Sequence, residues 1–340
     1  MPRILIVAPN WIGDALLAQP LLARLHAERP GLVLDAVAPE WVAPALARMP
    51  EIEEVIPTTL GHGALQLGVR WRLARALRTR RYDEAIVLPN SWKAALVPWL
   101  AGIPRRVGFV GEARYGLLNV LHRLDEGALP LMAERYAQLA ETPGAPPHRP
   151  LVLPRLEVDE ANLAITIARL GLDRSRPVVA FCPGAEYGPA KRWPARHFAA
   201  LARSLGARGR RVWLIGSPKD RPIGDEIAKL ADGAAINLCG RTDLAAAIDL
   251  LAACEAVVSN DSGLMHAAAA LGRPLVALYG SSSPTHTPPL APARLVSLKV
   301  ECSPCFQREC PLGHFKCMND LTPERVLAEI GEVDPALARA

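Results

Sequence analysis

The sequence predicts an α/β protein built from two Rossmann-like, doubly wound domains that face a cleft. Strand-like runs alternate with helical segments along most of the chain, which is typical of parallel sheets. At 340 residues the chain is too long for one ordinary domain. A proline-rich stretch divides the alternation into two series. We therefore expect domains at residues 1–150 and 151–340.

The first series opens with a continuous apolar run at residues 3–8, typical of a strand buried on both faces. Further strands are expected at 32–37, 54–56, 84–88 and 106–110, and helices at 15–29, 41–49, 69–80 and 92–101. The helix at 69–80 carries Arg70, Arg72, Arg75 and Arg78, which we expect on its polar side.

Five prolines fall within residues 142–154, and proline at this density continues neither a helix nor a central strand. This segment is predicted to be a linker. In the second series we expect helices at 157–170, 195–207, 223–231, 244–253 and from 263, and strands at 177–182, 211–215, 235–238, 256–259 and 274–279. Gly171 is expected to end the first of these helices.

The composition indicates a folded chain, because half of the residues are hydrophobic and 21% are charged. The net charge of +5 indicates either a solvated arginine-rich surface or acidic partners. No block of five like charges occurs, which argues against nucleic-acid binding. Neither a signal-peptide core nor a membrane-length apolar run is present. We expect a cytoplasmic protein that can contact a membrane surface.

The loop after the first strand, Asn10-Trp11-Ile12-Gly13-Asp14, contains the first candidate catalytic group. Asp14 stands at the carboxyl end of that strand, where a helix begins. One interpretation is that Asp14 only caps the helix, although Leu17 leaves no capping box. The other is that its carboxylate acts as a general base and removes a proton from an alcohol.

Residues 183–194 form a Gly/Pro-rich loop between a strand and a helix, and the loop ends in Lys191 and Arg192. Gly184 permits close approach of the backbone to a ligand, and the cations can neutralise phosphate. The order of residues is not that of a Walker A loop. The alternative is a surface loop with solvated cations.

The stretch 257–266 runs from an apolar strand through Asn260, Asp261 and Ser262 into a helix that starts near Gly263. A helix N-terminus attracts phosphate, although each of the three polar residues also suits a helix cap. His266 follows Ser262 by four residues and so lies on the same helical face. Residues 280–286 form another small-residue loop suited to wrapping the same ligand.

Together these segments resemble the lipopolysaccharide heptosyltransferases of glycosyltransferase family 9, which are two-domain GT-B enzymes. Within that family the likeness is greatest to the branch that adds the second heptose. The matching stretches, which span nearly the whole chain, are residues 9–19, 88–93, 111–116, 182–194, 260–266 and 279–290.

The resemblance implies an inverting transfer of L-glycero-D-manno-heptose from ADP-heptose to the heptosyl-Kdo2-lipid A inner core of lipopolysaccharide. It implies that Asp14 is the base and that Lys191 binds the diphosphate. The implied nucleotide-sugar segment is Asp261, Ser262, Gly263 and His266. The family's motifs do not fix the acceptor contacts, for which we expect Lys93 and Arg114. The N-terminal domain is expected to hold the acceptor, and catalysis is expected to depend on closure of the cleft.

No Asp-Xaa-Asp pair is present to chelate a metal diphosphate, so no cofactor is expected to be required. The implied partners are ADP-heptose, the lipid A-core acceptor and, transiently, the cytoplasmic face of the inner membrane.

Four of the seven cysteines, Cys302, Cys305, Cys310 and Cys317, gather near the C-terminus with His314 among them. Four thiolates can hold a structural zinc, and the leading C-x2-C spacing fits such a site. The later spacings are irregular for common zinc modules, and reduced thiols are the alternative. Cys182, Cys239 and Cys254 lie in apolar elements and are expected in the core.

Two classes of protein compete with a transferase. A nicotinamide-dependent sugar-nucleotide oxidoreductase or epimerase would need G-x-G-x-x-G after a strand, which the single Gly13 of the first loop does not supply. The second class is a non-catalytic nucleotide-binding module, which would need no carboxylate such as that of Asp14 opposite the phosphate-binding loops. Within the transferase family, the enzymes that add the first or third heptose are the nearest alternatives.

Overall fold

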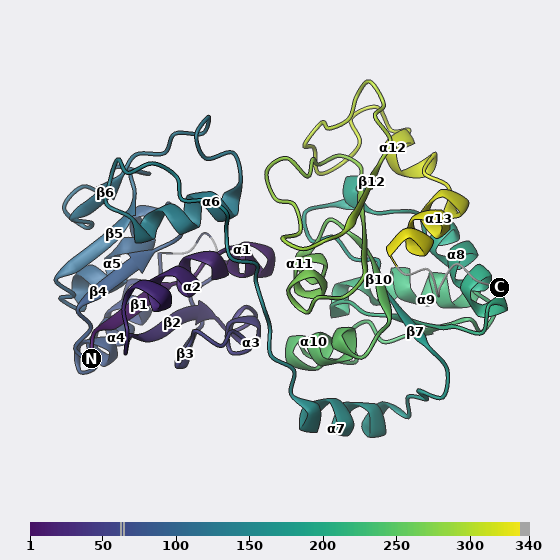
Figure 1. Cartoon of the computed structure of the whole chain (residues 1–340), viewed down its shortest axis with the longest axis horizontal. Coiled ribbons are helices and arrows are strands. Elements are labelled where there is room, and N and C mark those ends of the chain that lie inside the picture. The colour runs from purple at the N-terminus through teal and green to yellow at the C-terminus, as the bar shows by residue number, and fades with distance from the viewer. Residues whose placement is uncertain (62, 64, 334–340) are drawn as a thin grey trace. The chain divides into compact units, whose positions relative to one another are not determined.

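The computed structural model describes residues 1–61, 63 and 65–333, and the chain divides into two compact units, Met1–Leu156 and Glu157–Ala340. Residues 141–159, which include the proline-rich stretch, contain no helix or strand. The expected boundary at 150/151 falls inside this segment. Figure 1 shows the helices and strands of the two units.

Unit 1 contains a six-stranded parallel sheet in the order β3-β2-β1-β4-β5-β6. Its strands are β1 (Arg3–Val7), β2 (Val33–Pro39), β3 (Glu54–Thr58), β4 (Glu84–Val87), β5 (Arg105–Phe109) and β6 (Val120–His122). Ile4 of β1 lies opposite Leu34 on one side and Glu84 on the other. The five strands expected from the sequence are confirmed within a few residues, and β6 was not predicted.

The helices of unit 1 are α1 (Ile12–Leu17), α2 (Gln19–Glu28), α3 (Ala43–Leu46), α4 (Leu67–Arg78), α5 (Trp92–Leu100) and α6 (Met132–Ala137). The single helix expected at 15–29 is therefore two helices, and the first begins three residues early. The short α6 was not predicted. Leu5 packs with Ala74 and Leu77 of α4 and Val97 of α5, so these two helices cover one face of the sheet.

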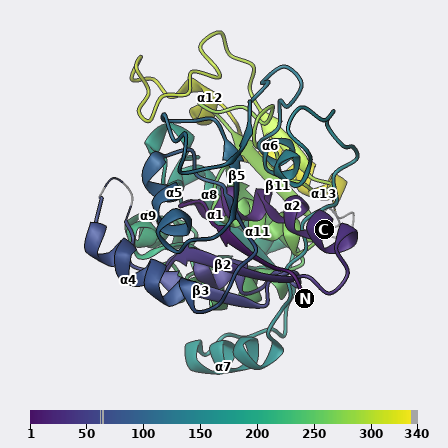
Figure 2. The same ribbon diagram turned by 90° about the vertical axis from the view of Figure 1, so that its left-hand side faces the viewer.

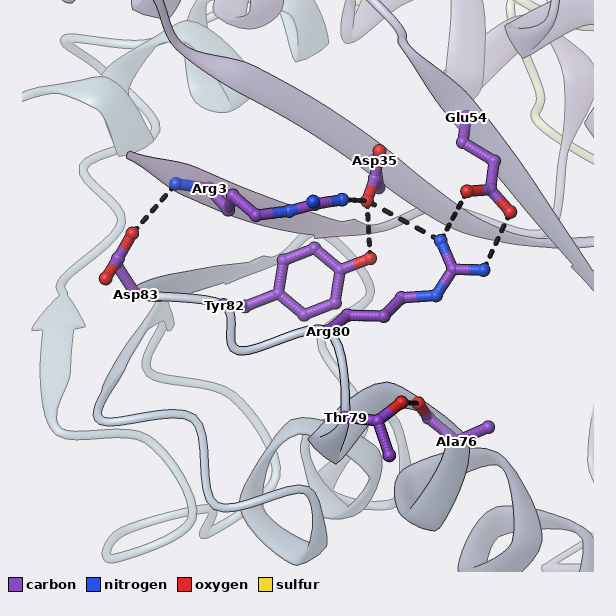
Figure 3. A network of polar contacts seen from close by, with 8 residues as sticks. All are labelled: Arg3, Asp35, Glu54, Ala76, Thr79, Arg80, Tyr82 and Asp83. Atoms are coloured by element: carbon purple, nitrogen blue, oxygen red, sulfur yellow. Dashed lines mark hydrogen bonds and ion pairs between the residues drawn. The ribbon is translucent and has the colours of Figure 1, made fainter. Parts of the chain in front are cut away.

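A polar network around Asp35 binds the strands of unit 1 together (Figure 3). Asp35 is fully buried in β2 and accepts hydrogen bonds from Arg3 Nη2 at 2.8 Å and from the Tyr82 hydroxyl at 2.6 Å. Arg80 lies 3.8 Å from the same carboxylate and also pairs with Glu54. A buried carboxylate requires such partners, so the network connects β1, β2 and β3 to the segment before β4.

Unit 2 contains a second six-stranded parallel sheet, in the order β12-β11-β10-β7-β8-β9. Its strands are β7 (Val178–Cys182), β8 (Arg211–Leu214), β9 (Ala235–Asn237), β10 (Ala256–Asn260), β11 (Leu275–Tyr279) and β12 (Arg294–Ser297). Counted within the unit, the order is 3-2-1-4-5-6, the same as in unit 1. The first five strands are confirmed, and β12 was not predicted.

The helices of unit 2 are α7 (Glu160–Leu170), α8 (Ala195–Ala207), α9 (Arg221–Leu230), α10 (Leu244–Ala252), α11 (Gly263–Ala270), α12 (Lys316–Asn319) and α13 (Pro323–Val333). Gly171 ends α7 with a φ of +63°, as predicted. The helices α12 and α13 were not predicted. Between β11 and α12 the chain consists mainly of loops around β12 (Figure 1).

Both sheets have a topological switch point, where the strand order reverses and loops diverge from the carboxyl ends of neighbouring strands. In unit 1 it lies between β1 and β4, and in unit 2 between β7 and β10. Asp14 follows β1, whereas Lys191 and Ser262 follow β7 and β10. The topology therefore directs the candidate residues of each unit to the position where this class of sheet binds ligands.

Among the described residues, no helix is both long enough and apolar enough to span a bilayer.

Candidate active site

The loop 183–194 of unit 2 is joined to the end of β10 by Asn260. Its side chain is fully buried, donates to the carbonyl of Pro183 at 2.8 Å and accepts from the N–H of Trp193 at 3.1 Å. Asn260 is therefore not a helix cap, which corrects one possibility raised by the sequence. It fixes both ends of the loop that carries Lys191.

The same loop is anchored to the C-terminal part of the unit. The buried Trp193 donates through Nε1 to the carbonyl of Leu321 at 2.8 Å and lies edge-on to Phe198 at 4.8 Å. Tyr187 donates to the carbonyl of Phe306 at 2.7 Å, and Arg308 Nε donates to the carbonyl of Tyr187 at 2.7 Å. The backbone is thus held on both sides of Lys191.

Lys191 meets Asp261 at the switch point of unit 2. Its ammonium lies 2.5 Å from Oδ2 of Asp261, which also accepts from the Ser282 hydroxyl at 2.6 Å. The ammonium also stands 5.0 Å from the centre of the Tyr187 ring. Three loops predicted to share a ligand, those after β7, β10 and β11, are therefore connected by side-chain contacts.

The helix α11 begins directly behind this ion pair. Its N-cap is Ser262, whose hydroxyl lies 3.2 Å from that of Ser259 and forms no capping bond within the described chain. The N–H groups of the first turn, beginning with Gly263, are therefore not satisfied by a side-chain cap. Together with the partial positive charge of the helix end, they form a seat for an anion.

His266 lies one turn further along α11 and is buried. Burial lowers the pKa of His266 to about 4; nearby Asp261 opposes the decrease and nearby Lys191 adds to it. The imidazole is therefore neutral near pH 7 and acts as a neutral hydrogen-bonding group. The structure brings His266, Lys191 and Asp261 into one electrostatic neighbourhood, as the sequence predicted.

Gly184 has a packing role that the sequence did not reveal. A Cβ at this position would lie 2.5 Å from the carboxyl group of Asp220. Asp220 accepts from the backbone N–H and the hydroxyl of Ser217, at 2.9 and 2.7 Å. The missing side chain at Gly184 therefore makes room for a carboxylate that holds the neighbouring loop after β8.

Asp14 of unit 1 is the third residue of α1 and is half-buried. The N-cap of α1 is Trp11, so the interpretation of Asp14 as an N-cap is wrong. Burial raises the pKa of Tyr136, and the negative charge of Asp14 raises it further. The carboxylate is therefore close to α6 and lies in the first turn of α1.

Lys93 lines a cavity of about 60 Å³ at the carboxyl ends of β1 to β4. Asn10 and Ser91 lie in the same wall, and Arg70 of α4 is the other charged lining residue. Arg70 is buried, which corrects its expected place on the polar side of the helix. Its position was readable from the sequence, because Arg70 precedes the buried Ala74 and Leu77 by four and seven residues.

Arg114 is buried and supports the loops of this sheet edge. Its guanidinium donates to the carbonyls of Phe109 and Pro89 and to the side-chain oxygen of Asn90, at 2.5 to 3.1 Å. Burial lowers the pKa of Arg114 to about 10, although Glu112 opposes this effect. The structure thus shows Arg114 positioning the loop before Lys93, and its contact with an acceptor stays a prediction.

The C-terminal cysteines are all free thiols, and Cys302, Cys305, Cys310 and Cys317 line one small cavity with His314. Phe315 donates its N–H to Cys310 Sγ at 3.4 Å. As placed in the described ranges, no three His, Cys, Asp or Glu side chains form a metal-binding group. A structural zinc therefore stays a prediction. Cys182, Cys239 and Cys254 are buried, as expected.

Two doubly wound parallel sheets in separate units, with an uncapped helix N-terminus and a lysine at one switch point and a carboxylate at the other, fit the GT-B class of glycosyltransferases. A family model confirms that the chain is a glycosyltransferase, because the model for glycosyltransferase family 9 (heptosyltransferase) matches residues 70–316. The chain belongs to glycosyltransferase family 9.

Relatives of nearly the same length support the family. The chain is 48% identical to lipopolysaccharide heptosyltransferase 2 of Escherichia coli K12, over 96% of this chain and 97% of that protein. It is 44% identical to lipooligosaccharide heptosyltransferase 2 of Haemophilus influenzae, over 97% and 99%. The solved structure of E. coli ADP-heptose lps heptosyltransferase II matches with a TM-score of 0.87 at 45% identity, over 98% of each chain.

Proposed function

We propose that this protein transfers L-glycero-D-manno-heptose from ADP-heptose to the heptosyl-Kdo2-lipid A inner core of lipopolysaccharide, with inversion at the anomeric carbon. The observation that carries the proposal is the anion seat of unit 2, where the uncapped start of α11 meets Lys191. The names of the relatives support ADP-heptose as the donor and lipopolysaccharide as the acceptor, and the finer identity of both follows from the resemblance of the sequence.

The donor is assigned to unit 2, with Lys191, Ser262 and Gly263 at the diphosphate. Lys191 supplies a full positive charge and α11 a partial one, so the ADP leaving group gains stabilisation as negative charge develops on it. Asp261 keeps the ammonium in place through the ion pair. Neutral His266 supplies a hydrogen bond.

These groups provide the charge that a diphosphate needs, so the proposed mechanism requires no metal ion. Enzyme treated with EDTA is expected to keep its rate. A loss of activity that is restored by a divalent cation would refute this part of the proposal.

The acceptor is assigned to unit 1, with Asp14 as the base. As the acceptor hydroxyl oxygen attacks the anomeric carbon, its proton passes to the Asp14 carboxylate. The new C–O bond forms on the face opposite the leaving group, and the bond to the ADP oxygen breaks with its electron pair. Attack from the opposite face produces the inversion.

The variant Asp14→Asn tests the base, because the amide keeps the shape but does not accept this proton. Transfer is expected to fall by about 10²- to 10⁴-fold, while ADP-heptose binding, measured by calorimetry, is unchanged. Asp125→Asn, in an exposed turn of unit 1, is the matched control. Near-normal turnover of the Asp14 variant would remove Asp14 from the mechanism.

The acceptor carries a lipid, and one face of unit 1 suits an anionic membrane surface. All five tryptophans of unit 1 are at least 41% exposed, whereas both tryptophans of unit 2 are fully buried. Trp71 lies on α4, and Trp92 and Trp99 lie on α5. Arg70 and Arg78 bond to carbonyls at the start and end of α5, so the two helices run side by side.

We call these three tryptophans, with the exposed Arg75 and Arg78 of α4, the indole–arginine face. Indoles favour the membrane interface, and arginine is attracted to anionic lipids. The helix α4 lies at the periphery of unit 1 (Figure 2). Contact with the inner membrane is therefore proposed through this face.

Flotation with vesicles of mixed phosphatidylethanolamine and phosphatidylglycerol tests the contact. Binding is expected to decrease when Trp71 and Trp99 are both replaced by Ala, and to weaken at high salt. Replacement of Trp41, exposed elsewhere in unit 1, is the control. Equal binding of both variants and the unchanged protein would refute the assignment.

The choice of acceptor is tested by mass spectrometry of products from ADP-heptose and defined core acceptors. One added heptose on heptosyl-Kdo2-lipid A is expected. A product only with unheptosylated or doubly heptosylated cores would favour the first- or third-heptose alternative, and release of ADP with none of them would refute the proposal.

A further inference from the structure

The cavity beside Lys93 in unit 1 is lined by charge of one sign. Its walls are mostly apolar, with Val7, Val37 and Val97 among them. Among the residues that the structure describes, the only charged ones in its lining are Arg70 and Lys93, and both are cationic. A volume of about 60 Å³ exceeds the space for a single water several-fold, so a small ionised group fits.

Arg70 is buried without an acidic partner. It is 5% exposed, and it donates from Nε to the carbonyl of Leu65 and from Nη1 to the carbonyl of Lys93, each at 2.7 Å. Among residues 1–61, 63 and 65–333, no carboxylate pairs with Arg70 or Lys93, and the side-chain hydrogen bonds of Arg70 come from Nε and Nη1 alone. Burial lowers the pKa of Arg70, and no neighbouring charge opposes this decrease.

Arg114, the other buried arginine, shows how a purely structural guanidinium is satisfied in this unit. All three of its nitrogens donate to oxygens of the protein, and Glu112 lies near enough to favour its charge. Arg70 differs in both respects. A buried cation that keeps an unused donor edge at a cavity wall has the arrangement that binds an oxyanion in a forked pair of hydrogen bonds.

We infer that Arg70 and Lys93 form an oxyanion subsite that binds a carboxylate or phosphate group of the acceptor and selects acidic acceptors over neutral ones. This inference rests on the proposed function for the identity of the acceptor. In this inference Arg70 binds the acceptor and takes no part in the proton transfer or in the breaking of the bond to ADP. It is therefore a specificity-determining residue and not a catalytic one. Its bond to the backbone carbonyl of Lys93 holds the two residues next to each other.

Kinetics with modified acceptors test the subsite. Arg70→Met is expected to lower kcat/KM for the native acceptor by about 10- to 100-fold, mainly through KM, with the KM for ADP-heptose unchanged. In the unchanged enzyme, either methyl esterification of the acceptor carboxylates or removal of its phosphates should cause a similar loss. Whichever of the two modifications lowers kcat/KM identifies the group that the subsite binds. The same modification should lower kcat/KM little further in Arg70→Met.

Two further variants separate binding from folding. Arg70→Lys keeps the charge but not the fork, and should fall between the unchanged enzyme and Arg70→Met. Arg123→Met, an exposed arginine of the same unit, is the control. An acceptor KM within twofold of normal in a folded Arg70→Met protein would overturn the inference. It would also be overturned if the modified acceptor lowered kcat/KM by the same factor in Arg70→Met as in the unchanged enzyme.

A measurement without turnover keeps this result distinct from the heptose assignment. Crystals soaked in selenate should show anomalous density at Arg70 and Lys93 in the unchanged protein and none there in Arg70→Met. Selenate at other positions with this cavity empty would overturn the subsite even if heptose transfer is confirmed. Selenate bound here in a protein that transfers no heptose would support the subsite while refuting the proposed function.

Discussion

Replacement of Asn260 by alanine tests how the donor loop is held. The amide of Asn260 bridges two backbone groups, the carbonyl of Pro183 and the N–H of Trp193, which lie at opposite ends of the loop. Both bonds are buried, so water cannot replace the lost partner without entering the core. The substitution leaves one donor and one acceptor unsatisfied.

Each orphaned buried group costs about 1–3 kcal/mol, so Asn260→Ala should destabilise unit 2 by about 2–6 kcal/mol. The functional effect is separate. Lys191 is two residues from Trp193, and misplacement by about 1 Å can cost about 10²-fold in rate. We expect kcat/KM for ADP-heptose to fall by about 10- to 100-fold under conditions where the variant remains folded.

Asn119 offers a matched control, because its side chain makes the same pair of bonds in an exposed place. It donates to the carbonyl of Pro104 at 2.6 Å and accepts from the N–H of Arg106 at 2.7 Å. Solvent can satisfy both groups after Asn119→Ala, so the cost should stay below about 1 kcal/mol. Urea unfolding and ADP-release kinetics should be measured for both variants.

If Asn260→Ala and Asn119→Ala shift the urea midpoint equally, the argument from buried unsatisfied groups fails. If Asn260→Ala destabilises the protein but its kinetics with ADP-heptose are normal, the loop is held by Trp193 and Tyr187 alone. Asn260 would then have no role in positioning Lys191.

The remaining predictions concern protonation, a buried bond and the cysteines. His266 has a pKa of about 4 in the folded state, so between pH 6.5 and 4 the unfolded chain gains a proton that the folded chain does not. The free energy of unfolding should therefore fall by about 2 kcal/mol between pH 7 and 5. If urea unfolding of His266→Gln shows the same pH dependence as the unchanged protein, this prediction is wrong. Tyr82→Phe removes a hydrogen bond to buried Asp35 and should lower the free energy of unfolding in urea by about 1–3 kcal/mol. An unchanged urea midpoint would show that Arg3 and Arg80 are sufficient to stabilise the carboxylate. If the cysteine group binds a structural metal, elemental analysis should find about one zinc per chain, lost in Cys302→Ser; absence of zinc from the unchanged protein would leave reduced thiols.

The architecture was largely predictable because parallel α/β sheets leave a strong local pattern. Runs such as residues 3–7 are buried on both faces, so they read as continuous apolar segments, and helices with one apolar face fill the intervals. The candidate loops followed from chain order, since parallel strands place their carboxyl ends on one edge. This reasoning predicted that Lys191, Asp261 and His266 would gather, and the structure confirms it.

The roles of individual polar residues were less predictable. Asn260 follows a strand and precedes a helix, which suits a cap as well as a bridge, and only tertiary contacts decide between them. The many arginines of α4 suggested that Arg70 faces the solvent. However, Arg70 precedes the buried Ala74 by four residues, and this spacing puts both residues on the same, inward face of the helix. Short elements such as β6 and α6 were missed because three to six residues show little periodicity.

The uneven distribution of tryptophan provides an optical probe for each half of the chain. Trp193 and Trp213 have no solvent contact, whereas the five indoles of unit 1 are roughly half exposed. The first pair should fluoresce at shorter wavelength and resist acrylamide, and the second group should emit further to the red and be readily quenched. Emission recorded across a denaturant series can therefore show whether the two halves melt together or in succession, without any added label.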